Sequence, residues 1–202
     1  NKFYANHNHL LKNTRFGSLY FDYRSNANLP RTNQNIVIYG NAMNDGSMFG
    51  SLSEYLNTSF VKANPTIELT TLYNNRKYHI FSVMIVSEPK DDNYDAFKFD
   101  KATFNNEADY NEWLAEAKQR SIYLTEVKHS YTDEYLTLVT DGDYFKGAKI
   151  VIIAKAIIGD AEVPEYRTNP SPRYPQIWYD QRSVTNPFKS GSLDSSTTLN
   201  HD

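Results

Sequence analysis

The stretch LTLVTDGDYFKGAKIVIIAK, residues 136–155, decides the fold class of this chain. It begins inside a run of β-branched and aromatic residues at 135–140 and ends inside an apolar run at 149–158. Both runs favour strands, and the polar, glycine-containing segment between them favours a turn. The second run is apolar at nearly every position, which is typical of a strand covered on both faces. We therefore predict two strands here, the second of them deeply buried.

Outward from this stretch, the same composition recurs in shorter runs that are bounded by turn residues. Further strands are predicted at 18–23, 36–40, 66–72, 77–87 and about 121–127. Apolar residues at helical spacing predict a short helix at about 48–56, which Asn57 and Thr58 should end. The clearest helix is predicted at 106–120, with Asn105 or Asn106 as its cap. About seven strands with two inserted helices fit a mainly β fold, a closed or nearly closed β-barrel.

The composition changes after Gly159. Five of the eight prolines lie between Pro164 and Pro187, and Ser, Thr and Asn dominate after Ser190. We therefore predict a β-barrel domain at 1–159 and a Pro/Tyr/Ser-rich extension at 160–202 whose last dozen residues are mobile. Four aromatic residues suggest that the first part of the extension lies against the barrel, namely Tyr166, Tyr174, Trp178 and Tyr179.

The overall composition excludes several function classes. The net charge is −3 without a basic stripe, so a nucleic-acid partner is not expected. No apolar run approaches the roughly 18 residues of a membrane span, so a membrane would be reached only through an anchor absent from this sequence. The chain has no cysteine, which excludes a thiol nucleophile, a disulfide and a zinc site with Cys ligands. No cofactor is predicted.

Metal binding has little support in the sequence. His7 and His9 have a spacing that suits a metal in a strand, but no third ligand is near, so a packing pair is predicted. Asp141-Gly142-Asp143 resembles a fragment of a calcium loop without its closing Glu, and Asp91, Asp92, Asp95 and Asp100 read as a solvated loop. We predict no metal site, with weak calcium binding left open.

Three segments, in order, resemble class B sortases. FGSLYFDYR at 16–24 and NIVIYGNAMNDGSMFGSL at 35–52 resemble the family's strand, Tyr-Gly-His turn and following helix. The long helix at 106–120 stands between two late strands, as in class B enzymes. The stretch 136–155 looks like the Thr-Leu-x-Thr-Cys strand end and the Arg-bearing strand after it. The resemblance covers about residues 10–158 and implies a sortase-like closed barrel of seven to eight strands.

The resemblance also implies an activity and a site. Sortases are transpeptidases on the surface of Gram-positive bacteria, and they use a Cys nucleophile, a His acid and a supporting Arg. In this sequence the matching positions hold Asn41, Asp141 and Lys149. An Asn side chain cannot carry a proton near neutral pH, a carboxylate is a weak acyl nucleophile, and Lys lacks the planar fork of Arg. These changes predict that the chain is not an enzyme. Pairing of Asp141 with Lys149 across the site is one interpretation, and drifted residues without a role are another.

Carried over from the family, a peptide groove would be bordered by three short segments. They contribute Ala42 and Met43, then Ser121, Ile122 and Tyr123, then Val139 and Thr140. The leading hypothesis is a catalytically inactive surface protein that binds a sorting signal, a pilin or a partner sortase on the outer face of a Gram-positive cell. The alternatives are a hydrolase or transpeptidase that uses Asp141 in place of the Cys, and a purely structural surface module.

Overall fold

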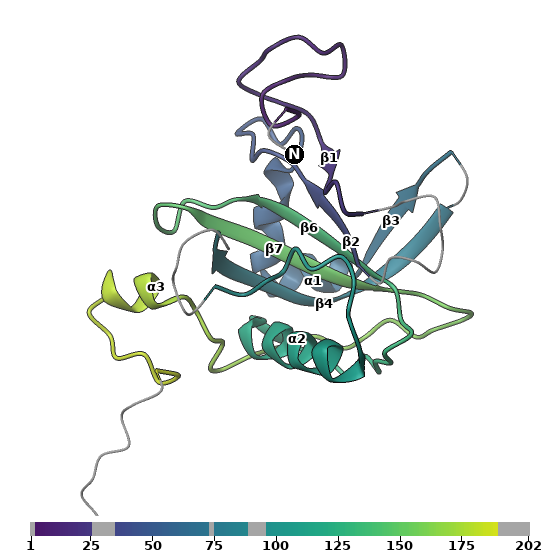
Figure 1. The fold of residues 1–202 in the computed structure, drawn as a ribbon. Coiled ribbons are helices and arrows are strands. Elements are labelled where there is room, and N and C mark those ends of the chain that lie inside the picture. The colour runs from purple at the N-terminus through teal and green to yellow at the C-terminus, as the bar shows by residue number, and fades with distance from the viewer. Residues whose placement is uncertain (1–2, 26–34, 73–74, 89–95, 190–202) are drawn as a thin grey trace, which may run out of the picture.

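The computed structural model describes residues 3–25, 35–72, 75–88 and 96–189 (Figure 1). Its core is a six-stranded sheet with the order β1-β2-β6-β7-β4-β3. The strands are β1 (Tyr20–Phe21), β2 (Asn35–Tyr39), β3 (Thr66–Thr70), β4 (Asn75–Ser87), β6 (Tyr135–Asp141) and β7 (Ala148–Ala156). β2 and β6 run parallel, and the other neighbouring pairs are antiparallel. The stretch 136–155 therefore supplies the two central strands.

The predicted fold class, mainly β with few short helices, is confirmed. The sheet curls as a half-barrel, and among the described residues its ladder ends at β1 on one side and β3 on the other. Among the described residues β5 (Tyr123–Leu124) pairs only with β8 (Arg167–Thr168), in a ladder separate from the six-stranded sheet. The strand predicted at 121–127 is only two residues long in the structure, as β5. Ile122, the residue before it, donates its backbone hydrogen bond to Val83 of β4.

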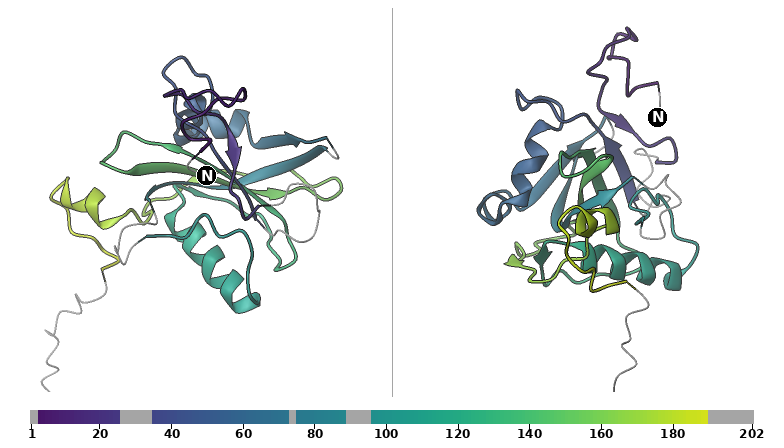
Figure 2. Two further views of the ribbon diagram at one scale, coloured as in Figure 1. Left: turned by 45° about the horizontal axis from the view of Figure 1, so that its top comes forward. Right: turned by 90° about the vertical axis from the view of Figure 1, so that its left-hand side faces the viewer.

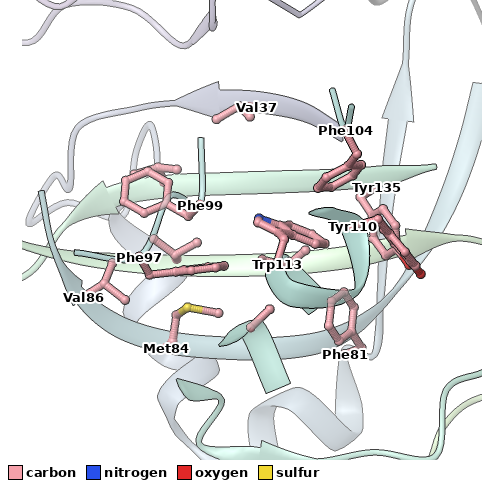
Figure 3. Packing of buried hydrophobic residues seen from close by; sticks show 14 residues of the cluster. Val37, Phe81, Met84, Val86, Phe97, Phe99, Phe104, Tyr110, Trp113 and Tyr135 are labelled. Carbon is pink, nitrogen blue, oxygen red and sulfur yellow. The ribbon is translucent and has the colours of Figure 1, made fainter. Parts of the chain in front are cut away.

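The predicted long helix is α2 (Glu107–Arg120), and it covers one face of the sheet (Figures 1 and 2). Of the two candidate caps, Asn106 is the cap, because its side chain accepts a hydrogen bond from the Asp109 amide at 2.9 Å. Tyr110 and Trp113 point from the helix into an aromatic cluster on the sheet, which includes Phe104 and Tyr135 (Figure 3). This packing stabilises the helix, since isolated helices of this length are marginal in water.

The opposite face of the sheet carries the 3₁₀ helix η1 (Gly50–Leu56) and the helix α1 (Thr58–Ala63). The sequence pattern predicts a single helix that ends at Asn57 and Thr58, so it misses α1. The Asn57 side chain accepts a hydrogen bond from the Ser59 amide at 2.8 Å, so the same residue ends η1 and caps α1. Asn has both roles because it disfavours helix interiors and is among the best N-caps.

The C-terminal extension contributes side chains to the core. Tyr166 is buried in the cluster on the η1 face, and its hydroxyl donates a hydrogen bond to the Ile80 carbonyl at 2.6 Å. Further along, the helix α3 (Gln176–Asp180) follows, and Tyr174 and Trp178 pack against Phe145 of the β6–β7 hairpin. The segment predicted to be mobile, after Ser190, lies outside the described residues, and so do Asp91, Asp92 and Asp95.

His129 should make folding sensitive to acid. Burial, with Lys118 and Lys155 nearby, lowers the pKa of His129 to about 3, while an unfolded His titrates near pH ~6.5. Below pH ~6.5 only the unfolded state takes up this proton, so the free energy of unfolding falls as the pH falls. Between pH 7 and pH 5 the natural chain should lose free energy of unfolding through this proton. We expect the loss to be about 1–2 kcal/mol smaller in His129→Gln, measured by urea unfolding at the two pH values.

The Gln substitution is the appropriate one because it keeps a hydrogen-bonding side chain beside Tyr135, whose hydroxyl lies 3.0 Å from His129 Nδ1. His9, which is exposed, provides the matched control. An unchanged pH dependence in His129→Gln, or an equal change in His9→Gln, would contradict the prediction.

Candidate functional site

The parallel pairing of β2 with β6 brings two of the predicted site residues together. In this register Tyr39 lies opposite Val139, and the Gly40 amide donates to the Val139 carbonyl at 3.1 Å. Asn41 is the next residue after Gly40, and Asp141 ends β6. Because the two strands run in the same direction, their ends lie at the same end of the sheet, where Asn41 follows β2 and Asp141 is the last residue of β6.

The third predicted residue, Lys149, is placed by the β6–β7 hairpin. Asp141 and Lys149 are directly opposite in the antiparallel ladder, and Lys149 Nζ lies 2.5 Å from Asp141 Oδ1. The Asp141 side chain is 57% exposed and that of Lys149 is 21% exposed. The predicted pairing of these residues is therefore present in the structure, as a partly exposed ion pair. We call Asn41, Asp141 and Lys149 the corner.

The N-terminal segment borders the corner. Asn41 Nδ2 donates a hydrogen bond to the Phe16 carbonyl at 3.0 Å. Tyr20 of β1 stacks on Tyr39 with ring centroids 5.3 Å apart. Burial raises the pKa of Tyr20, and the negative charge of Asp141 raises it further. The Tyr20 hydroxyl and the Asp141 carboxylate therefore interact electrostatically. The sequence analysis did not single out Tyr20 as a neighbour of the site, because the residue fits the pattern of the strand predicted at 18–23.

In chemical terms the corner offers an amide, a carboxylate and an ammonium. The Lys149 ammonium can donate to a peptide carbonyl, and the Asp141 carboxylate can accept from a peptide amide. A thiolate mechanism is impossible with these residues, and the Asn41 side chain cannot act as an acid or base near neutral pH. What the geometry provides directly is a set of hydrogen-bond donors and acceptors at one end of the sheet.

Two of the three predicted groove segments directly adjoin corner residues in the sequence. Ala42 and Met43 follow Asn41 and are exposed and half-buried, respectively. Val139 and Thr140 of β6 are only 1% and 2% exposed. Val139 belongs to the same buried cluster as Trp113 of α2. The side chains of Val139 and Thr140 are therefore buried, and because the two residues are consecutive in β6 they point to opposite faces of the sheet.

Ser121, Ile122 and Tyr123 form the third predicted groove segment, which directly follows α2. Ser121 is buried, and its hydroxyl accepts hydrogen bonds from the amides of Val83 and Tyr123 at 3.4 and 3.1 Å. The Ile122 amide donates a hydrogen bond to the Val83 carbonyl of β4 at 2.8 Å. The prediction that this segment borders a peptide groove with Asp141 stays a prediction; Ile122 and Tyr123 share a cavity with Tyr144 of the β6–β7 hairpin.

Two other candidate metal sites, His7 with His9 and Asp141 with Asp143, fall within the described residues. His7 Nδ1 donates to the Phe3 carbonyl at 2.8 Å, and the two rings stack. Across the residues that the structure describes, no three His, Cys, Asp or Glu side chains gather as they would around a metal ion.

Comparison with known proteins identifies the family. No family model matches the chain. Sortase B of Listeria monocytogenes is 34% identical over 154 residues, which is 75% of this chain and 59% of that protein. The solved structure of this relative matches with a TM-score of 0.65 at 32% identity, over 77% of this chain and 81% of that one. The chain belongs to the class B sortase family. The resemblance found in the sequence is thereby confirmed.

Other sortase B structures agree. That of Clostridium perfringens has a TM-score of 0.67 and 30% identity, covering 78% of this chain and 82% of its own. A substrate complex of Staphylococcus aureus sortase B has a TM-score of 0.65 and 30% identity, covering 78% and 69%. This sortase B relative nevertheless spans little more than half of the curated proteins that it matches, 59% and 56% of their lengths.

One prediction from the sequence is corrected here. The absence of cysteine led to the prediction that the chain is not an enzyme. Its relatives are sortase B proteins, which are transpeptidases, and membership of that family does not support the prediction. The missing cysteine excludes a thiolate nucleophile and nothing further.

Proposed function

We propose that this sortase B relative acts in surface-protein processing by binding an extended peptide of the sorting-signal class at the corner. The observation that carries the proposal is the convergence of Asn41, Asp141 and Lys149 at one end of the sheet, with both charged side chains partly exposed. Solved sortase B relatives include a substrate complex and a complex with a glycine tripeptide, which supports a peptide as the partner.

The three residues stand where the family's His, Cys and Arg stand, and we assign them peptide-binding roles. Lys149 keeps the positive charge of the family's Arg and would hold a peptide carbonyl. Asp141 orients the Lys149 ammonium through their hydrogen bond. Asn41, fixed by its bond to the Phe16 carbonyl, would present its side-chain oxygen to a peptide amide. Ala42 and Met43 would extend the contact along the turn.

The partner and place of action follow from the same proposal. The peptide would be the sorting signal of a pilin or other surface protein, met on the outer face of a Gram-positive cell. The described residues contain no helix that is both long and apolar enough to span a bilayer.

Titration of the ¹⁵N-labelled protein with peptides that carry class B sorting motifs tests the proposal. We expect saturable shifts of the Asn41, Asp141 and Lys149 amides at micromolar to low millimolar peptide. Lys149→Gln should weaken binding about five- to twentyfold, because a hydrogen bond from a charged group is lost. Mass spectrometry of the same samples would reveal any cleavage of the peptide.

Lys146→Gln is the matched control, since Lys146 is exposed on the same hairpin and its loss changes the net charge equally. It should change the affinity less than twofold. If both variants weaken peptide binding equally, the affinity depends only on the net charge of the protein. If scrambled peptides bind as tightly as sorting motifs, the site does not recognise sorting signals.

A further inference from the structure

A cavity of about 570 Å³ lies at the end of β7 that is remote from the corner. His79, Lys155, Glu162 and Glu165 are among the residues that line it, and we call it the far cavity. Lys149 of the corner and Lys155 both belong to β7, six positions apart, which is about 20 Å along a strand. The volume falls within the roughly 300–1,000 Å³ of small-molecule sites. The far cavity is therefore a candidate ligand site that is separate from the corner.

One wall of the far cavity is the loop 157–165, which is held at both ends. At its start the Ile157 amide donates to the Lys77 carbonyl at 2.9 Å. At its end Tyr166 is buried, and its hydroxyl donates to the Ile80 carbonyl at 2.6 Å. Residues between these two anchors supply one side of the lining. The cavity is thus built into the fold.

His79 provides a buried polar group on the inner surface of the far cavity. Its side chain is on the same face of the sheet as that of Lys155, its partner in the β4–β7 ladder. Only 7% of His79 is exposed, yet no described residue makes a hydrogen bond to its ring. Buried polar side chains usually have such a partner. Burial also lowers the pKa of His79, so the ring is neutral at pH 7 and has one nitrogen free to accept a hydrogen bond.

Two charged residues of the lining already have partners. Glu126 pairs with Arg167 at 2.8 Å. The Lys155 ammonium lies 3.0 Å from Asp133 Oδ2 and donates to the Lys128 carbonyl at 2.6 Å. The charges of Glu126 and Lys155 are therefore balanced within the protein.

The remaining charges of the lining favour a cation. Within the described part of the chain, the carboxylates of Glu162 and Glu165 and the ammonium of Lys128 have no ion-pair partner. Two negative charges against one positive charge give the far cavity a negative potential. The described residues do not gather three His, Asp or Glu ligands around a position for a metal ion. The cation that fits is therefore an organic one.

The rim of the far cavity is apolar. Ile158 and Val163 both line the cavity, and they are 81% and 60% exposed. An aliphatic group that covers these side chains removes apolar surface from water, which is favourable. A ligand that combines a cationic head with an aliphatic stem would thus use both the rim and the inner surface.

We propose that the far cavity binds a small organic cation, a primary ammonium on an aliphatic stem. The ammonium donates a hydrogen bond to the neutral ring of His79 and is attracted by the carboxylates of Glu162 and Glu165. The stem covers Ile158 and Val163 at the rim. No residue of the corner takes part, so this binding is independent of the peptide site.

Titration with n-hexylammonium, followed by the NMR shifts of the His79 ring and of the Lys128 and Glu162 amides, tests the proposal. We expect saturable shifts with a dissociation constant of about 1 mM, as suits a ligand of this size. Three related compounds each remove one property: hexan-1-ol lacks the charge, hexanoate reverses it, and hexyltrimethylammonium cannot donate a hydrogen bond. Each should bind about tenfold more weakly.

Three results of this titration would overturn the proposal. If hexan-1-ol or hexanoate binds as tightly as hexylammonium, the cavity does not select a cation. If hexyltrimethylammonium binds equally well, His79 accepts no hydrogen bond from the ligand. If the His79 ring shows no shift, the ligand is not in the far cavity.

Protein variants test the binding groups directly. His79→Phe keeps an aromatic ring without its nitrogens and should weaken hexylammonium binding about tenfold. The double variant Glu162→Gln, Glu165→Gln changes only exposed side chains, so it decides the case if His79→Phe does not fold. It should weaken binding about fivefold.

Two control variants complete the test. The double variant Glu54→Gln, Glu112→Gln removes the same charge at exposed positions outside the lining, and it should change the affinity less than about twofold. Equal weakening by the two double variants would mean that only net charge attracts the ligand. Asp141→Asn should leave the affinity unchanged. A loss of binding in Asp141→Asn would place the ammonium at the corner, and either of these results would overturn the proposal.

Discussion

Replacing Tyr166 by Ala should lower the free energy of unfolding by about 3–5 kcal/mol, the range of large aromatic truncations in cores. Tyr166 is 2% exposed and packs in the cluster with Tyr123 and Ile152. The substitution also removes the 2.6 Å hydrogen bond to the Ile80 carbonyl. Urea denaturation followed by far-UV circular dichroism gives the value directly.

Two comparison variants separate the contribution of the Tyr166 ring from that of its hydroxyl and from the effect of removing an exposed tyrosine. Tyr166→Phe keeps the ring and should cost about 1–2 kcal/mol for the unpaired Ile80 carbonyl. Tyr23→Ala, at a side chain that is 79% exposed, should change stability by less than about 0.5 kcal/mol. A loss below about 1 kcal/mol for Tyr166→Ala would instead favour the predicted division of the chain, with residues 1–159 folding without the extension.

The extension illustrates what composition can and cannot predict. Its proline spacing predicts an irregular backbone, and between Gly159 and Lys189 the structure has only β8 and α3 as regular elements. Four aromatic residues suggested contact with the barrel, and Tyr166 and Tyr179 are buried. Which aromatic enters the core depends on the path of the chain over the sheet, and the sequence carries no periodic signal for that path.

The corner was predictable because it rests on long motifs in a fixed order. Asn41 and Asp141 each follow a strand whose apolar run is clear, and Lys149 begins the next run. The surroundings of the third groove segment were not predictable in the same way. Ser121 and Ile122 follow α2 directly, but their partner Val83 is nearly forty positions earlier, and only the fold brings them together.

The triple variant Asn41→His, Asp141→Cys, Lys149→Arg should cleave a class B sorting peptide at least a hundredfold faster than the natural chain. The Cys supplies a thiolate nucleophile at the end of β6, and the His supplies an acid for the leaving amine. The Arg restores a planar, bidentate donor on the neighbouring strand. Liquid chromatography of the cleaved peptide measures the rate.

Two controls separate chemistry from position. Asp143→Cys in the His and Arg background places the thiol two residues further along the hairpin, and it should give no gain, because a nucleophile about 1 Å out of place loses much of its rate. Alkylation with iodoacetamide verifies that each thiol is accessible. Because members of a catalytic set act as a unit, Asp141→Cys alone should recover far less than the triple variant.

A triple variant that folds, alkylates and still fails to cleave would be informative about binding. In that case the catalytic groups would be present, and the variant would fail because it does not hold the peptide against the residue at position 141. The buried Val139 and Thr140, which precede this position in β6, would then be the residues to examine. A gain in cleavage would mean that the corner still holds its peptide in a reactive geometry, and that the groups replaced in this chain limit the chemistry.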